Sequence, residues 1–225
     1  MRPKSAAVII VAGGSGSRMG RSKQMLPLNG KAILERSVEA VLKIPSAGEV
    51  IVVTGADIFR RLAKKFKGLK HALPGATRLQ SVQNGVAAAD AKYKFIAVHD
   101  GARPLVSPAA AQACLEAAAK TKAAVLAVPL KDTVKEVKDN FVSKTLDRAR
   151  LWAAQTPQCY EAATLRAALK KYGALKDATD ESQLVERLGV KVAVVPSGYE
   201  NIKITTPEDL IIAGALCKKL CRKKN

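Results

Sequence analysis

The stretch Ala6–Pro27, AAVIIVAGGSGSRMGRSKQMLP, joins an apolar, β-branched run to a glycine-rich segment. The run Ala6–Ala12 has no charged side chain, which predicts a first strand that is covered on both faces. Glycines at positions 13, 14, 16 and 20 follow directly. Glycine lets the backbone approach a ligand closely and turn its N–H groups toward it, which suits a phosphate group. The stretch therefore predicts a strand that leads into a phosphate-binding loop.

Two familiar phosphate-binding loops do not fit this segment. A dinucleotide fingerprint, G-x-G-x-x-G, starting at Gly14 would need its third glycine one position before Gly20. It would also need an acid at the end of the second strand, Glu49–Thr54, which this chain lacks. A P-loop closes with Gly-Lys-Ser/Thr, whereas this loop reads Gly20-Arg21-Ser22-Lys23. What remains is a glycine-rich loop with two cations, Arg18 and Lys23, of which the first can span two phosphate oxygens with its fork. On this segment alone, a tight turn with solvent-exposed cations is the alternative.

Further apolar strands alternate with helical stretches along the whole chain. We expect strands at Ala6–Ala12, Glu49–Thr54, Lys94–Asp100, Ala123–Pro129 and Val190–Pro196. We expect helices at Ala32–Leu42, Ile58–Phe66, Arg78–Ala89, Pro108–Lys120, Glu161–Lys171, Glu181–Leu188 and Pro207–Leu220. This order predicts an α/β fold over residues 1–225 as a single domain: a doubly wound, mostly parallel, Rossmann-like sheet with helices on both faces. In such sheets ligands bind at the carboxyl ends of the strands.

The segment Lys131–Arg150 interrupts this alternation. It alternates apolar and polar residues around a turn at Lys138-Asp139-Asn140, which predicts an extended β-hairpin arm. Its apolar content is too low for a core of its own, and isolated hairpins are marginally stable. We therefore expect the arm to pack on a second subunit, and the protein to be a homodimer.

Composition and charge narrow the function classes. The 225 residues include 38 Lys+Arg against 19 Asp+Glu, a net charge of +19, with 48% hydrophobic and 25% charged residues. These fractions are those of a globular protein rather than a disordered basic tail. The excess charge fits nucleic acid, an anionic membrane or an anionic small substrate. Aromatic residues amount to only 4%, which disfavours the alternative of a basic nucleic-acid-binding protein.

The longest apolar run, Ala6–Gly14, is too short to span a membrane. Four scattered cysteines without metal or disulfide spacing indicate a reduced, cytoplasmic setting.

Five motifs in register resemble one enzyme family. The pattern G-G-x-G-x-R-M-G followed by S-K-Q-x-L-P-L is similar to the signature of sugar-phosphate nucleotidyltransferases. The motifs VHDGARPLV (Val98–Val106), LDRARLWAAQTPQCY (Leu146–Tyr160), DATDESQLVE (Asp177–Glu186) and NIKITTPEDL (Asn201–Leu210) follow in order. Together, over Ala6 to Leu216, they resemble the 2-C-methyl-D-erythritol 4-phosphate cytidylyltransferases of the non-mevalonate isoprenoid pathway. Two positions depart from that family: Ala76 stands near a usual acid or second glycine, and Gly13 stands where many members have Ala. A ribitol-5-phosphate cytidylyltransferase, in which that Gly also occurs, is the alternative, but DRARLW and ATDES favour the first family.

The resemblance implies a reaction between CTP and methylerythritol phosphate, with release of pyrophosphate, and assigns residues to it. The implied catalytic residues are Arg18, Lys23, Arg148 and Lys203. The implied CTP-binding residues are Ala12, Gly13, Gly14, Gly16, Gly75, Arg78, Ser81, Asp100 and Gly101. The implied acceptor-binding residues are Arg103, Thr133, Arg148, Thr156, Thr179, Asp180 and Lys203. Asp100 is the implied Mg²⁺ ligand, Mg²⁺ is the expected cofactor, and neither a membrane nor a specific nucleic acid is an expected partner.

Two of these assignments, and His99 beside Asp100, carry a structural expectation. Arg148 lies in the arm, so a homodimer would deliver it to the active site of the neighbouring subunit. Arg103 is either a substrate contact or a structural ion pair. His99 has a structural role, because a phosphate monoester is already an anionic nucleophile at neutral pH and needs no general base.

Overall fold

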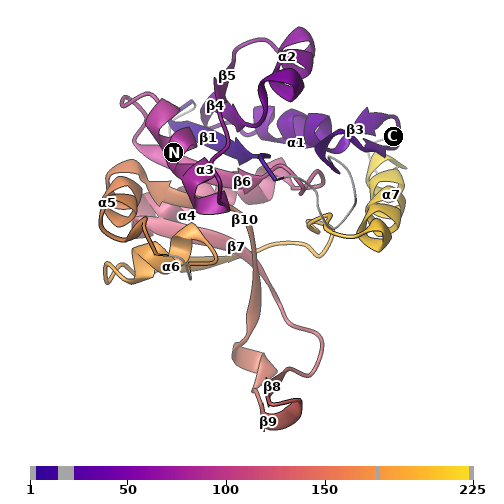
Figure 1. Ribbon diagram of the computed structural model, residues 1–225, viewed down its shortest axis with the longest axis vertical. Coiled ribbons are helices and arrows are strands. Elements are labelled where there is room, and N and C mark those ends of the chain that lie inside the picture. The colour runs from indigo at the N-terminus through magenta and orange to yellow at the C-terminus, as the bar shows by residue number, and fades with distance from the viewer. Residues whose placement is uncertain (1–3, 15–22, 176–177, 223–225) are drawn as a thin grey trace.

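A seven-stranded sheet forms the centre of the molecule (Figure 1). The computed structural model describes residues 4–14, 23–175 and 178–222. The strand order is β11 (Ala193–Pro196), β7 (Ala123–Pro129), β10 (Trp152–Glu161), β6 (Phe95–Asp100), β1 (Ala6–Val11), β4 (Ala47–Val53) and β5 (Leu69–Ala72). Among the described residues of this sheet, only strand β10 runs antiparallel to its neighbours. The predicted α/β class and the mostly parallel sheet are confirmed.

Strand β1 lies in the middle of the sheet and sends alternate side chains to two separate cores. Ala6, Val8 and Ile10 face one core, which the helices α1 (Ile33–Leu42), α2 (Ala56–Lys65) and α4 (Pro108–Thr121) cover. Ala7 and Ile9 face the other core, beneath α3 (Arg78–Ala88), α5 (Ala162–Tyr172) and α6 (Glu181–Glu186). Burial on both faces explains why the strand has no polar position.

The carboxyl end of β1 defines the position of the site. Strand β1 pairs with β6 in parallel register from Ala6↔Phe95 to Val11↔Asp100. Asp100 therefore lies beside the last residue of β1, just before Ala12–Gly14. The parallel register thus brings the first and the second expected motifs, the glycine-rich pattern and VHDGARPLV, to one edge of the sheet.

A third, smaller core lies outside the sheet. Helix α7 (Pro207–Arg222) packs there against the segment that holds the short 3-10 helix η2 (Lys23–Met25) and the two-residue strands β2 (Pro27–Leu28) and β3 (Lys31–Ala32). Its buried side chains include Leu28, Ile204 and Cys217. This core fixes the chain on both sides of Lys203 to the main body. None of the described helices is both long enough and apolar enough to cross a membrane.

Two strands of the central sheet differ from the sequence-based expectation, as do the two-residue strands β2 and β3 outside it. Strand β10 contains Gln155-Thr156-Pro157-Gln158, and a polar run with proline is atypical of a central strand. The structure accommodates it through a shift of register between Ala154 and Gln158, where proline needs no ladder hydrogen bond. Strand β5 was also not expected, because its four residues, LKHA, form only a short edge strand.

The expected hairpin arm is present. Strands β8 (Lys135–Lys138) and β9 (Phe141–Thr145) pair antiparallel, and the short helix η3 (Arg148–Arg150) follows. Asp139 and Asn140 have positive φ angles of 50° and 67°, as in a two-residue type I′ turn. Figure 1 shows the arm projecting away from the sheet. Its apolar side chains Val137, Phe141 and Val142 are 59–78% exposed.

The packing of α3 on β1 leads to a prediction about stability. A Cβ atom on Gly85 would lie 2.4 Å from Ile9 Cγ2 and 3.0 Å from Val53 Cγ2. We expect Gly85→Ala to lower the free energy of unfolding by about 1–3 kcal/mol, because the sheet has to move to admit the methyl group.

Gly214, inside α7, is the matched control. A Cβ atom there meets only Asn29 Oδ1, at 3.8 Å. Gly214→Ala should therefore raise the free energy of unfolding by about 0.5–1 kcal/mol through helix propensity. Urea denaturation of both variants measures the difference, and equal stabilities would contradict the close approach of α3 to β1.

Candidate active site

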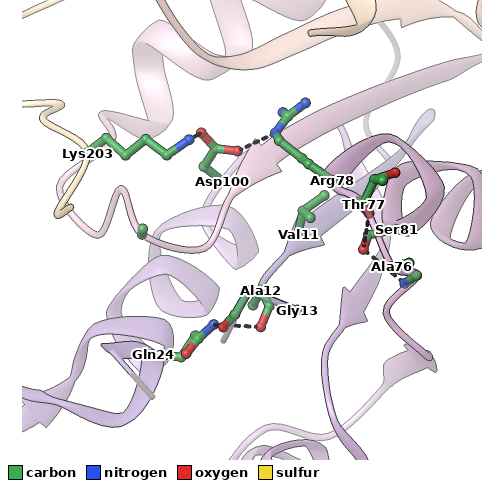
Figure 2. Close-up of a pocket in the computed structure, with 13 residues that line it drawn as sticks. Val11, Ala12, Gly13, Gln24, Ala76, Thr77, Arg78, Ser81, Asp100 and Lys203 are labelled. Carbon is green, nitrogen blue, oxygen red and sulfur yellow. Dashed lines mark hydrogen bonds and ion pairs between the residues drawn. The ribbon is translucent and has the colours of Figure 1, made fainter. Parts of the chain in front are cut away.

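Two cavities open at the carboxyl ends of the strands and share three charged residues. The first, of about 420 Å³, is lined by Val11, Ala12, Gly13, Gly14, Gln24, Gly75, Ala76, Thr77, Arg78, Ser81, Asp100, Ala102 and Lys203. The second, of about 200 Å³, is lined by Arg78, Asp100, Arg103, Ala154, Gln155, Thr156, Gln158, Thr179, Asp180 and Lys203. Arg78, Asp100 and Lys203 line both. Figure 2 shows these three side chains converging at one end of the first cavity.

Asp100 is the centre of this charged group. Its carboxylate oxygen Oδ1 lies 3.2 Å from Arg78 Nε, and Oδ2 lies 2.8 Å from Lys203 Nζ and 3.8 Å from Arg103 Nε. The side chain is 9% exposed. Burial by itself would raise the pKa of Asp100, but the nearby Arg78, Lys203 and Arg103 outweigh it, so the pKa lies well below its usual range. Asp100 is therefore ionised at neutral pH.

Arg78 joins Asp100 to a second buried acid. It is the first residue of α3, whose N-cap Thr77 accepts a hydrogen bond from Gln80 N. Its Nη1 donates to Glu181 Oε1 at 2.6 Å, and the side chain of Glu181 is fully buried. Burial raises the pKa of Glu181, and Arg78 offsets part of that rise. Burial would lower the pKa of Arg78, but its two carboxylate partners raise it above the usual value.

Arg103 fastens the segment that carries Lys203. Its Nη1 donates to Asn201 O at 2.7 Å and its Nη2 to Ala154 O at 3.5 Å. The side-chain amide of Asn201 in turn donates to Gln155 Oε1 and Thr156 O, both at 3.0 Å. Burial lowers the pKa of Arg103. Arg103 thus makes an ion pair with Asp100, one of its two expected roles, and also lines the second cavity, whereas its contact with a substrate stays a prediction.

His99 belongs to the supporting network beneath the site. It is fully buried, its Nδ1 lies 3.1 Å from Thr156 Oγ1 and its Nε2 lies 3.2 Å from Arg103 O. Thr156 Oγ1 accepts from Asp100 N, so its own hydrogen is directed to His99 Nδ1, and Nε2 donates to the carbonyl. Burial lowers the pKa of His99 to about 4. A neutral histidine with both nitrogens bonded has a structural role, as expected.

The turn before α3 lines the first cavity beside Arg78. Gly75 N donates to Ser81 Oγ, and Ser81 Oγ donates to Thr77 O, both at 3.0 Å. Gly13 packs directly on this turn, since a Cβ atom there would lie 2.3 Å from Pro74 Cβ. The absence of a side chain at position 13 therefore lets the end of β1 lie directly against the turn.

The structure brings most of the expected site residues together. Eight line the first cavity, namely Ala12, Gly13, Gly14, Gly75, Arg78, Ser81, Asp100 and Lys203. Arg103, Thr156, Thr179 and Asp180 line the second. Gly16, Arg18 and the side chain of Lys23 lie outside the described residues.

Three expected residues lie away from both cavities. Gly101 is buried, and its N–H donates to Val11 O while its carbonyl accepts from Ser37 Oγ. It serves the packing beneath the site, because a Cβ atom there would lie 2.9 Å from Leu34. Thr133 and Arg148 are exposed on the arm, outside the cavities of their own chain.

Sequence reasoning missed other residues of the site. Gln24 and Thr77 line the first cavity, and Gln155 and Gln158 line the second. Glu181 was missed because an acid in the first turn of a helix normally stays in water, where it favours the helix dipole. The signal that could have found it is its place directly after Thr179 and Asp180.

Comparison with known proteins decides the family. A model of the 2-C-methyl-D-erythritol 4-phosphate cytidylyltransferase family matches residues 6–219. The chain belongs to this family. A cytidylyltransferase of that name from Endomicrobium trichonymphae is 46% identical over 217 residues, which are 94% of this chain and 98% of the relative. Another from Caldanaerobacter subterraneus subsp. tengcongensis is 41% identical over 228 residues, or 96% and 100% of the two chains.

Solved structures agree with the family. The crystal structure of 4-diphosphocytidyl-2C-methyl-D-erythritolsynthase from Anaerococcus prevotii has a TM-score of 0.86 and 34% identity, and covers 96% of each chain. The 2-C-methyl-D-erythritol 4-phosphate cytidylyltransferase of Thermus thermophilus has a TM-score of 0.78 and 33% identity, and covers 97% of this chain and 100% of its own. The cytidylyltransferase family is one of nucleotidyltransferases in isoprenoid biosynthesis, and membership favours this reading over the ribitol phosphate and nucleic-acid alternatives.

The ion pair between Arg78 and Glu181 leads to a second prediction. Arg78→Met leaves the fully buried Glu181 carboxylate without its cation, so we expect a loss of about 3 kcal/mol in the free energy of unfolding. The double variant Arg78→Met/Glu181→Gln removes both charges and should regain most of that stability. Its activity should stay as low as that of Arg78→Met, because Arg78 faces both cavities.

Urea denaturation of the two variants and the parent measures the recovery of stability, and steady-state kinetics of the same proteins measure whether activity recovers with it. Recovery of activity together with stability would show that Arg78 serves the fold alone.

Proposed function

We propose that the protein transfers the cytidylyl group of CTP to 2-C-methyl-D-erythritol 4-phosphate, with CTP in the first cavity and the acceptor in the second. Family membership supports the reaction. The observation that supports this placement of the substrates is that the two cavities share Arg78, Asp100 and Lys203. Two phosphate-bearing substrates, one in each cavity, would bring their reacting groups to these three side chains.

The chemistry asks for positive charge rather than for a base. An oxygen of the acceptor phosphate attacks the α-phosphorus of CTP, the bond to the β-phosphate breaks, and its electron pair leaves with pyrophosphate. The attacking phosphate has a second pKa near about 6, so it is already anionic at neutral pH. The neutral, fully bonded His99 is consistent with this requirement. Negative charge that develops on the transferring and leaving groups is stabilised by fixed cations.

Lys203 is the best placed of the described cations for that role. It lines both cavities, and its side chain is 37% exposed, so its ammonium group is accessible from the cavities. Asp100 holds Lys203 Nζ at 2.8 Å in a fixed direction. We assign Arg18 and Lys23, from the glycine-rich loop, to the triphosphate on the resemblance alone.

The residues present fit a magnesium ion that is bound jointly with the nucleotide. Asp100 is the one carboxylate among the described residues that line the first cavity. No group of three or more potential metal ligands occurs in the described part of the chain. Mg²⁺ is commonly held by one or two carboxylates together with substrate phosphates. Asp100 would hold the ion, which when bound would neutralise charge on the triphosphate.

We further propose a homodimer in which the arm completes the site of the partner. Arg148 and Thr133 are exposed and lie outside the cavities of their own chain, and Arg148 Nη1 donates to the carbonyl of Lys131 within the arm. The exposed apolar residues Val137, Phe141 and Val142 supply a surface that a second copy would cover. A reduced, cytoplasmic setting is part of the proposal, and the free thiols of Cys114, Cys159 and Cys217 favour it.

A direct assay tests the acceptor. With CTP and Mg²⁺, we expect pyrophosphate release with 2-C-methyl-D-erythritol 4-phosphate, at a kcat/KM about 10²-fold above that with ribitol 5-phosphate. Coupled detection of pyrophosphate with each acceptor at matched concentrations gives the ratio. Equal rates, or release with ribitol 5-phosphate alone, would overturn the assignment of the acceptor.

Mixed dimers test the shared site. We expect Lys23→Ala to lower kcat by about 10²–10³-fold, as for loss of one donor to developing charge, and Arg148→Ala to raise KM for the acceptor more than KM for CTP. After the two variants are unfolded and refolded together, statistical mixing puts half of the chains in mixed dimers with one intact site each. The mixture should then regain about a quarter of the parent activity. Lys23→Ala and Arg148→Ala, each refolded alone and assayed at an acceptor concentration far below the KM of Arg148→Ala, are the controls, and a mixture that is no more active than the sum of these two would contradict the exchange of arms.

A further inference from the structure

Gln24 makes two hydrogen bonds to the backbone at the edge of the first cavity. It belongs to η2 and is 4% exposed. Its Nε2 donates to Ala12 O at 3.0 Å and to Gly14 O at 2.6 Å. Figure 2 shows this amide beside Ala12 and Gly13, at the opposite end of the view from Arg78, Asp100 and Lys203.

The two bonds use the full donor capacity of one amide nitrogen. An –NH₂ group has two hydrogens, and each of them meets a carbonyl that follows β1. Ala12 O also accepts from Thr54 Oγ1 at 3.3 Å. A carbonyl oxygen carries partial negative charge, so an unbonded carbonyl at this edge would repel a polyanion. Gln24 engages two such oxygens without adding a net charge of its own.

The same bonds tie two parts of the chain together. Gln24 follows Lys23 directly and is ten residues away from Gly14 in sequence. Its side chain therefore fixes the backbone of η2, which includes Lys23, relative to Ala12–Gly14. Ala12 N is itself bonded to Val53 O in the sheet, at 2.8 Å. The position of η2 is thus referred to the central sheet through one amide group.

We propose that Gln24 is a positioning residue for the nucleotide: its amide sets the backbone of Ala12–Gly14 and the place of Lys23 for CTP. This inference rests on the proposed function. It assigns Gln24 no contact with the acceptor, because Gln24 does not line the second cavity. The effect of changing it should therefore fall on CTP and leave the acceptor largely unaffected.

Two substitutions remove the bonds in different ways. Gln24→Met keeps the length of the side chain and removes both donors. Gln24→Glu keeps the shape and places a carboxylate oxygen against two carbonyls. Gln83→Met is the matched control, because Gln83 Nε2 also donates to a backbone carbonyl, Gly173 O at 3.3 Å, but lines neither cavity. The measurements are kcat and KM for both substrates, Kd for CTP by calorimetry without acceptor, and thermal unfolding.

We expect both Gln24 variants to lose about 10²-fold in kcat/KM for CTP, as displacement by an ångström does elsewhere, with a weaker Kd for CTP in both. The kcat/KM for CTP should be lower in Gln24→Glu than in Gln24→Met. In both variants, KM for the acceptor at saturating CTP should change less than about threefold, and Gln83→Met should match the parent.

An equal rise in KM for both substrates, or an unchanged Kd for CTP, would overturn the inference. So would failure of both Gln24 variants to fold while Gln83→Met folds, since Gln24 would then serve the fold. If the parent itself releases no pyrophosphate with either acceptor, the proposed function fails, whereas a loss of CTP affinity in the Gln24 variants would still support the placement of CTP.

Discussion

The burial of the Asp100 carboxylate beneath three cations is the constraint on which the rest of the site depends. A carboxylate at 9% exposure can remain ionised only if its surroundings supply compensating charge. Arg78, Arg103 and Lys203 supply that charge from three separate segments of the chain: the start of α3, the loop after β6 and the loop before α7. All three converge on one residue at the end of β6, so the charged wall between the two cavities is built from distant parts of the chain. Asp100 thereby acts as a structural anchor in the absence of substrates.

This anchor has a second layer that holds its cations in position. Glu181 restrains Arg78, and Asn201 restrains Arg103 through its carbonyl. Thr156 Oγ1 links the backbone of Asp100 to His99. Removal of a group from such a network leaves a buried polar partner unsatisfied, which costs more than the bond itself contributed. The site is thus rigid at its charged centre, a property that suits electrostatic stabilisation of a transition state.

The sequence predicted the elements whose pattern is local and left out those that depend on distant partners. Strand β1 and the start of α4 were predictable, because a fully apolar run and the pair Ser107-Pro108 are signals within a few residues. Strand β10 was not, because its polar residues and proline favour a loop, and its polar side chains find their partners only in the folded protein: Gln158 Nε2 donates to Asp180, and Gln158 Oε1 accepts from Tyr160. Glu181 and Gln24 escaped for the same reason. Each resembles an ordinary surface residue until the fold brings its partner, Arg78 or the carbonyls of Ala12 and Gly14, within reach.

The contact between Gly13 and Pro74 has a consequence for how this chain can diverge. The Cβ atoms of an alanine at position 13 and of the present proline would be 2.3 Å apart, a distance that no pair of carbon atoms without a bond between them tolerates. Pro74 precedes Gly75, whose N–H is held by Ser81, so the ring has little freedom to retreat. Evolution from glycine to alanine at position 13 therefore has to pass through a change at position 74 or through a rearranged turn. The residues at positions 13 and 74 are therefore coupled, and their identities should vary together among relatives of this chain.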